Sequence, residues 1–506
     1  MKRTSLTTAV IASIAGVAGI SNMASAVYLN TDGLGQVLIY PYYTVNANNS
    51  TAISVVNTTN QGKAIKVRFL EAYDSREVLD FNLYMSPQDV WTGQVVPVGA
   101  GAGIFSGDNS CTVPALPKTS ATAQPFLTYA FDGEQDQGTD GGPTDVSRTL
   151  EGYIELIEMG TVTNTNNKSL AALTHGSGGV PANCAQLVGA WATSPPGYWT
   201  AGGGTPDLSA PSGGLFGSGT IVNVGLGTVE GYNADAVDSF WLPGSLPTHT
   251  DPTSLAPDLS SGGSATSYVF ANGALATTSY SRSLDAVSSL FMSDFVYNQY
   301  ITNSSIGAST EWVVTFPTKN YYVDIFKLSG GTINFSGAAL CSLTACPIAA
   351  DDPFDIVFGT DPVVPGSSCS SVGISFYDRE EKTSSAGTGF SPVPNKRGNA
   401  LCYESQVVTF NQGTKPSKIL GSNLVANINT GFQAGWASLQ LYNSSLAFAH
   451  HELESEGGNT FFGQPVTGFE VDQFINGNLG GGILSNYTAA YRHKFHRLCN
   501  TGSTCS

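Results

Sequence analysis

Apolar and polar residues alternate along several short stretches of the chain, a pattern typical of half-buried β-strands. Within 65–69, apolar residues alternate with Lys66 and Arg68, so this strand is expected to have one face in water. A similar alternation runs through 79–85 and predicts a neighbouring antiparallel strand. Further strands are expected at 52–56, 150–157, 221–224, 311–316, 406–410 and 435–442.

The stretch 37–43, VLIYPYY, is apolar without alternation, which indicates a strand covered on both faces. Pro41 has no backbone N–H, so it is expected at a sheet edge or in a bulge. We predict that Tyr40, Tyr42 and Tyr43 lie on an unpaired strand that adds to the sheet of a second copy.

One segment has helical periodicity. Leu284, Val287, Phe291 and Phe295 recur every three to four residues, and Ser283 can cap the segment. The pattern predicts an amphipathic helix from Leu284 to Tyr300. The segment 321–326 is expected to be the hairpin partner of the strand at 311–316.

These elements predict a mostly β fold, an immunoglobulin-like antiparallel β-sandwich with one amphipathic helix. Four stretches rich in Gly, Ser, Thr, Pro and Asp are expected as long loop insertions of a single composite domain, residues 27–506. They lie at about 98–148, 161–214, 243–263 and 337–400.

The first 26 residues have the features of a signal peptide. Lys2 and Arg3 precede an apolar stretch from Leu6 to Ile20, and 24–26 (ASA) fits a cleavage site. Later in the chain, no stretch reaches the roughly 18 consecutive apolar residues of a membrane-spanning helix, so no transmembrane segment is expected. The predicted location is extracellular or at the cell surface.

The cysteines agree with export, because an oxidising compartment favours disulfides. The sequence has eight: Cys111, Cys184, Cys341, Cys346, Cys369, Cys402, Cys499 and Cys505. Their connectivity is not fixed by sequence. Pairing of neighbours predicts the disulfides 111–184, 341–346, 369–402 and 499–505.

The net charge argues against one class of partner. With 38 acidic and 21 basic residues, the chain carries −17 and repels phosphate backbones, so nucleic acid is not an expected partner. Charged residues make up only 12% of the chain, and glycine accounts for 58 residues. Such a composition suits close packing against other protein molecules.

Several phrases resemble those of uncharacterised secreted or cell-surface β-rich proteins of Gram-negative bacteria. They span nearly the whole chain after residue 26: VLIYPYYTV at 37–45, VRFLEAYDSREVLDFNLYMSP at 67–87, TEWVVTFPTK at 310–319 and GQPVTGFEVDQFING at 463–477. The resemblance implies an exported β-rich protein. It implies no activity and no catalytic residue.

An acidic loop suggests calcium, since alternate carboxylates can face one hard cation. The carboxylates concerned are Asp132, Glu134, Asp136 and Asp140. The EF-hand pattern fails, because Gln137 stands where glycine is needed and Pro143 where glutamate is needed. A hydrated acidic loop is the alternative. A weaker calcium candidate is 351–355 (DDPFD). No other cofactor is expected.

Motifs for catalysis are not found. The chain has no Gly-x-Ser-x-Gly, and His-Glu-x-x-His fails at 451–455 because position 455 is Ser. A metal site at 450–456 remains an alternative to a solvated loop. Glu151 and Glu155 would lie about 13 Å apart on one strand, too far for a glycosidase pair. We therefore expect no enzyme.

The predicted function is a cell-surface structural protein that assembles with itself into a layer, matrix or fibre, or an adhesin. One alternative is an extracellular glycan-binding module, in which exposed aromatic residues stack on sugar rings. The aromatic candidates are Tyr40, Tyr42, Tyr43, Tyr321, Tyr322, Trp312 and Trp436. Another alternative is a secreted hydrolase whose residues come from separate loops.

Overall fold

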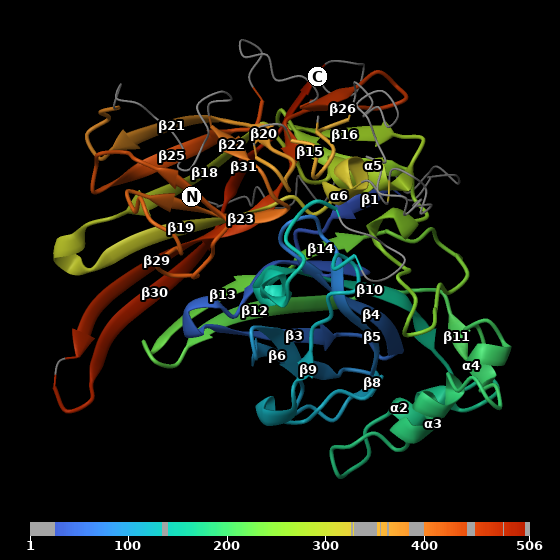
Figure 1. Ribbon diagram of the computed structural model, residues 1–506. Helices are drawn as coiled ribbons and strands as arrows, with labels where there is room; N and C mark the ends of the chain where they lie inside the picture. The colour runs from blue at the N-terminus through green and yellow to red at the C-terminus, as the bar shows by residue number, and fades with distance from the viewer. Residues whose placement is uncertain are drawn as a thin grey trace, which may run out of the picture.

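The computed structural model describes residues 26–133, 140–324, 327, 352–354, 356–361, 364–383, 399–442, 451–478 and 480–500. The chain is mostly β-structure and contains several antiparallel sheets, as predicted (Figure 1). The immunoglobulin-like arrangement stays a prediction. Residues 1–25 of the signal peptide expected at 1–26 lie outside the described residues. Strand β1 begins at Val27.

A ten-stranded sheet organises the N-terminal half. Figure 1 shows it running from β8 at the bottom to β16 near the top right. A further short strand, β11 (Leu208–Ser209), pairs with β10. The order across the sheet is β16 (Ala274–Ser279), β15 (Thr266–Ala271), β1 (Val27–Leu29), β14 (Asp235–Asp238), β2 (Val37–Thr44), β10 (Glu151–Val162), β4 (Gly62–Glu71), β5 (Glu77–Met85) and β8 (Cys111–Val113).

A six-stranded sheet packs on one face of the first. Its order is β13 (Thr228–Asn233), β12 (Leu215–Asn223), β3 (Ser50–Asn57), β6 (Val90–Val98), β7 (Gly101–Phe105) and β9 (Gln124–Pro125). Inward residues of both sheets, such as Val67 and Phe81 against Val55 and Trp91, form one continuous core. The strands with alternating apolar and polar residues thus form two sheets that pack against each other through their apolar faces.

The strand β2 confirms the prediction from its unbroken apolar pattern, because all eight of its residues are buried. Leu38 and Tyr40 contribute to the core between the two sheets, whereas Val37 and Ile39 contribute to a second hydrophobic core. Its register with β10 shifts between Gly152 and Ile154, which lie opposite Tyr43 and Tyr40. Pro41 therefore sits in a bulge, one of the two places expected for it.

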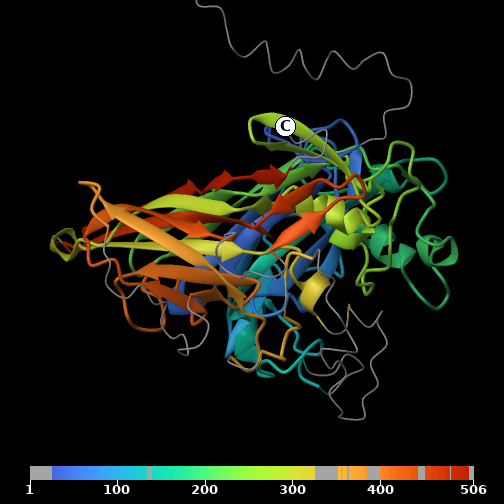
Figure 2. The ribbon, with the colours of Figure 1, turned by 90° about the horizontal axis from the view of Figure 1, so that it is seen from above.

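The C-terminal half forms further sheets, whose orange and red strands extend to the left in the view from above (Figure 2). One has the order β21 (Gly373–Asp378), β25 (Ala434–Gln440), β18 (Phe295–Ile301), β31 (Lys494–His496). The next has the order β24 (Val425–Ile428), β23 (Ser405–Phe410), β19 (Ala308–Thr315), β29 (Thr467–Asn478), β30 (Leu484–Arg492). Three small sheets complete this half: β17 (Met292–Ser293) with β28 (Gln464–Pro465), β20 (Ser370–Ser371) with β22 (Ala400–Leu401), and β26 (Glu452–Glu454), β27 (Thr460–Phe462), β32 (Leu498–Asn500).

The helix predicted at 284–300 is correct only in its first part. Helix α5 spans Ser283–Ser289, and the chain then enters β17 and β18. The four-residue spacing of Phe291 and Phe295 fits a helix but is also a multiple of the strand period of two, so it did not distinguish them. The hairpin partner expected at 321–326 is wrong as well, because α6 (Asn320–Val323) occupies its start. Strand β19 instead pairs with β23 and β29.

The wet face predicted for the strand at 65–69 is also wrong. Lys66 and Arg68 on β4 are buried, because the segment after Gly244 folds over this face. The Lys66 ammonium donates to the backbone carbonyls of Asp251 and Ser254 and to the carboxylate of Asp80. A loop insertion therefore covers the second face of the sheet and supplies the polar partners that buried charges require.

The predicted insertions contain short elements. Within 98–148 lie β7, β8, β9 and η2 (Ser120–Thr122), and η3 (Val146–Leu150) begins there. Within 161–214 lie α2 (Ser169–Leu173), α3 (Cys184–Ala190) and α4 (Tyr198–Ala201). The insertion at 243–263 has η4 (Leu259–Ser261), and much of 337–400 falls outside the described residues. Two further 3₁₀ turns are η1 (Asn46–Asn48) and η5 (Ser304–Ile306).

Candidate functional site

The strand predicted to mediate assembly lies inside a sheet. Strand β2 pairs with β10 along most of its length and with β14 at residues 37–39, and Tyr40, Tyr42 and Tyr43 are all fully buried. The Tyr42 hydroxyl donates to the carboxylate of Glu151 at 2.6 Å. The prediction that these residues form an unpaired strand for a second copy is therefore wrong, because β10 pairs with this part of β2 and all three tyrosine side chains are buried within the fold.

The predicted calcium loop is only partly described, since Glu134 and Asp136 lie outside the described residues. Asp132 accepts a hydrogen bond from Thr128, and both carboxylate oxygens of Asp140 bind the Arg148 guanidinium, at 2.9 and 2.5 Å. Among the described residues, no group of three or more His, Cys, Asp or Glu side chains is placed to hold a metal ion. Asp140 thus has another role, as the counter-ion of a buried arginine.

Two of the predicted disulfides are present, Cys111–Cys184 and Cys369–Cys402. Cys499 is also disulfide-bonded, whereas Cys341, Cys346 and Cys505 lie outside the described residues.

The histidine cluster considered for metal binding, at 450–456, has His450 outside the described part. His451 is buried, with its Nδ1 2.5 Å from the carbonyl of Leu441.

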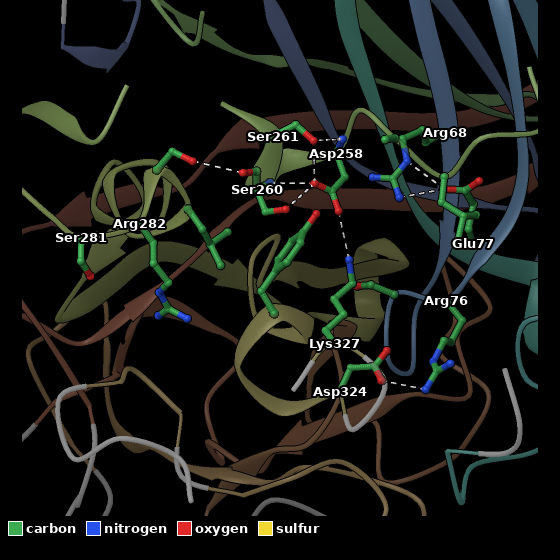
Figure 3. Close-up of a pocket in the computed structure, with 16 residues that line it drawn as sticks. Arg68, Arg76, Glu77, Asp258, Ser260, Ser261, Ser281, Arg282, Asp324 and Lys327 are labelled. Carbon is green, nitrogen blue, oxygen red and sulfur yellow. Dashed lines mark hydrogen bonds and ion pairs between the residues drawn. The ribbon is translucent and has the colours of Figure 1, made fainter. Parts of the chain in front are cut away.

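A cavity of about 760 Å³ lies where β4, β5, η4 and α6 meet (Figure 3). Four cations line it: Arg68, Arg76, Arg282 and Lys327. Each already faces a carboxylate. Arg68 binds Glu77 and Glu155, Arg76 binds Asp324, Arg282 binds Asp285, and Lys327 binds Asp258. The charged side chains around this cavity therefore mostly form ion pairs with one another.

Two carboxyls of this cavity have opposite pKa shifts. Burial raises the pKa of Glu77 to about 7 despite its pairing with Arg68. At Asp258 burial acts in the same direction, but Lys327 and Arg68 outweigh it and hold the pKa well below its usual range. Opposed shifts are found in acid–base pairs. Here, however, Arg68 holds Glu77 through two bonds of 2.7 and 2.8 Å, which favours a structural role.

A second candidate is the outer face of the β21–β25–β18–β31 sheet. Residues directly opposite each other on neighbouring strands share a face. The registers place Tyr377 opposite Trp436 and Trp436 opposite Gln299, and Tyr297 opposite Ser438 and Lys494. The side chains Tyr377, Trp436, Tyr297 and Phe295 thus form a row on one face, which we call the aromatic track.

The rings of the aromatic track follow one another closely. Tyr377 and Trp436 stack with centroids 4.7 Å apart, Trp436 and Tyr297 lie 6.4 Å apart, and Tyr297 and Phe295 stack at 5.6 Å. The Trp436 side chain is 44% exposed, and the other three are partly exposed. The row is therefore partly open to solvent and is not part of the buried core.

A cavity of about 670 Å³ opens beside Trp436 and offers polar groups. Its wall includes Gln299, Arg379, Asp472 and Tyr491. The Gln299 amide donates to Asp472 at 3.3 Å. Burial, followed by the charge of Asp472, raises the pKa of neighbouring Glu470 to about 9, so Glu470 is protonated at neutral pH. Hydrogen-bonding groups therefore lie beside the exposed ring.

Of the seven aromatic residues proposed from sequence for sugar stacking, the structure exposes Trp436 alone. Tyr40, Tyr42, Tyr43, Tyr321, Tyr322 and Trp312 are buried. Tyr297 and Phe295 were missed because they fell within the predicted helix. The alternation of Phe295, Tyr297 and Gln299 with Val296 was the signal that could have placed them on one strand face.

Comparison with known proteins adds no assignment, since no family model, curated protein or solved structure matches the chain. In the part of the chain that the structure describes, no helix has the length and apolar character needed to cross a membrane.

Proposed function

We propose that this protein is an exported carbohydrate-binding protein whose aromatic track holds glycan outside the cell. The observation that carries the proposal is the exposed indole of Trp436, stacked on Tyr377 and followed by Tyr297 and Phe295 on the same sheet face. The two disulfides support the extracellular location expected from the first 26 residues.

The chemistry of the track suits sugars. A pyranose ring has an apolar C–H face that packs on an aromatic ring, and hydroxyl groups at its edge that require hydrogen-bond partners. The track supplies both, because Ser375, Gln440 and Lys494 share the face with the rings and Gln299 lies next to Trp436. Aromatic side chains also lose little conformational entropy on binding, since they have few rotatable bonds.

This proposal changes the order of the functions predicted from sequence. The self-assembling role has lost the strand through which it was expected to act. An adhesive role is compatible with glycan binding, because a protein attaches to a cell or matrix through such a face. The hydrolase alternative gains nothing from the Arg68 cavity, where Glu77 is held by an arginine.

The test is a binding assay with the chain lacking residues 1–26. Cellulose, chitin and other insoluble polysaccharides are incubated with the protein, and the bound fraction is measured by depletion. We expect Trp436→Ala to weaken binding about tenfold or more, the equivalent of about 1.4 kcal/mol. Phe270→Ala is the matched control, because Phe270 is an exposed aromatic residue on β15, outside the track, and its loss should leave binding unchanged.

Two results would contradict the proposal. One is a wild-type protein that binds none of the polysaccharides. The other is a Trp436→Ala variant that unfolds at the wild-type urea concentration yet binds as well as wild type.

A further inference from the structure

The geometry of the aromatic track also defines the shape of the ligand, provided that the proposed carbohydrate function holds. Tyr377 lies on β21, Trp436 on β25, and Tyr297 and Phe295 on β18. The track therefore crosses from β21 over β25 to β18, then runs along β18, and occupies one sheet face. We infer that it binds an extended, uncharged, linear polysaccharide along several consecutive sugar units.

The spacing of the rings supports a chain rather than a single sugar. Three successive centroid distances of 4.7, 6.4 and 5.6 Å connect four rings into one continuous row. Each distance is close to the size of one pyranose ring. A terminal monosaccharide would contact one or two of these side chains and leave the others exposed to water.

The orientation of the rings supports an extended chain. The planes of Tyr377 and Trp436 are 19° from parallel, and those of Tyr297 and Phe295 are 12° from parallel. Rings that stack in this way turn their flat faces toward each other, so the row presents ring edges and the exposed part of Trp436 to a ligand that lies along it. A helical polysaccharide would turn its sugar faces away after a short distance.

Charge argues against an acidic polysaccharide. The cavity beside Trp436 has three acidic side chains in its wall, Asp378, Glu381 and Asp472, and one basic side chain, Arg379. The track itself has one basic neighbour, Lys494, opposite Tyr297. The chain as a whole carries −17. A polyuronic acid would meet repulsion both on approach and at the cavity, whereas a neutral chain would not.

The experiment measures binding of soluble oligosaccharides of increasing length by calorimetry. Cello-oligosaccharides and chito-oligosaccharides, from one sugar to six, represent neutral extended chains. Malto-oligosaccharides represent neutral helical chains, and oligogalacturonates represent acidic chains. We expect affinity for at least one extended series to rise with length until about four sugars cover the track and then to level off, since further units find no ring. The helical and acidic series should bind at least about tenfold more weakly.

Variants along the track separate this inference from the proposed function. Phe295→Ala removes the ring farthest from Trp436, and Tyr297→Ala removes the next. Each should weaken binding of the longest oligosaccharide about five- to tenfold while leaving binding of the monosaccharide or disaccharide unchanged. Phe270→Ala again serves as the control, and urea unfolding verifies that each variant is folded.

The outcomes are distinct. If wild type binds sugar and Trp436→Ala does not, but affinity is independent of length or Phe295→Ala has no effect, the extended-chain inference fails and the carbohydrate function stands. Preference for the acidic or the helical series would also overturn the inference alone. Failure of wild type to bind any of the four series, or the insoluble polysaccharides, would overturn both.

Discussion

Lys63 and Glu158 form an ion pair in which both side chains are completely buried, with 2.8 Å between Nζ and Oε1. The Lys63 ammonium also donates to Ser212 Oγ and the Gly213 carbonyl, and Glu158 accepts the backbone N–H groups of both residues. The pair thus fastens the segment before β12 to the ten-stranded sheet. Buried charges are tolerated when every proton and lone pair has a partner in this way.

Loss of one partner of this pair is expected to be costly. In Lys63→Met, the Glu158 carboxylate would remain buried without its counter-ion. We expect the free energy of unfolding to fall by about 3–5 kcal/mol. Urea denaturation followed by tryptophan fluorescence measures this change.

Lys418→Met is the control for that variant, because Lys418 is an exposed lysine. Its replacement should change stability by less than about 0.5 kcal/mol. If Lys63→Met were as mild as Lys418→Met, the buried pair would contribute little and the charge of Glu158 would have another source of stabilisation.

Buried carboxyls predict a second effect, which depends on pH. Glu404 is fully buried, and its Oε2 accepts hydrogen bonds from Ser75 and from the backbone of Asn320. Burial raises its pKa to about 8. Between its ordinary pKa of about 4.5 and a pH of about 8, the folded state holds a proton that the unfolded state has lost, so stability falls as pH rises.

Glu404→Gln removes this contribution and keeps an acceptor oxygen for Ser75. The stability of the variant relative to wild type should therefore rise with pH across that window, by up to about 1.4 kcal/mol per pH unit, and become constant above it. Urea unfolding at pH 5, 7 and 9 tests this. Glu454→Gln, at an exposed position on β26, should show a difference that does not vary with pH. A constant difference for Glu404→Gln as well would show that Glu404 is ionised throughout.

Nearly all the strands that the sequence predicted are present, because their apolar residues alternate or form unbroken runs, but others, among them β6, β29 and β30, were not predicted. The sequence predicted a sheet edge or a bulge at Pro41, because proline cannot donate a ladder hydrogen bond, and the register of β2 with β10 places a bulge there. It failed at Arg68, whose alternation with apolar neighbours indicated a wet face. The residues that cover this face, such as Asp258, are nearly two hundred positions away, and local periodicity contains no information about them.

The aromatic track illustrates a second limit. Trp436 was proposed for sugar stacking together with six aromatic residues that proved to be buried. Aromatic residues are common in both cores and binding faces, and only the pairing of β21, β25 and β18 decides which side of each strand meets solvent. Tyr377 and Trp436 are 59 positions apart and become neighbours through this register alone.

Two buried histidines predict a third effect. His249 lies among Tyr84, Trp191 and Trp199, and its Nδ1 is 2.9 Å from the carbonyl of Gly204. His493 Nε2 is 2.9 Å from the carbonyl of Val313. A carbonyl only accepts, so each nitrogen carries a proton. Burial lowers both pKa values to about 4.

These histidines should stay neutral through mildly acidic conditions. The unfolded chain takes up protons at histidine near pH 6.5, whereas the folded chain does so near pH 4, so these two residues lower stability as pH falls through that interval. The measurement is a titration of the histidine ring signals by NMR. We expect those of His249 and His493 to stay constant from about pH 8 to about pH 5.5. A midpoint near 6.5 for either residue would mean that its ring is accessible to water.

The disulfide Cys111–Cys184 predicts a fourth effect, because it ties the edge strand β8 to helix α3 in the insertion at 161–214. It closes a separation of 73 residues, compared with 33 for Cys369–Cys402. In the chain-entropy model, replacing the first pair with serines should cost about 4 kcal/mol, and replacing the second should cost about 0.7 kcal/mol less. Urea unfolding of both double variants gives this comparison.

Limited proteolysis should in addition show faster cleavage within 174–183 in Cys111→Ser/Cys184→Ser, since this stretch leads directly to the bridged helix. Equal stability of that variant and wild type would mean that the packing of Leu187 and Trp199 against Tyr84 holds the insertion without the covalent bond.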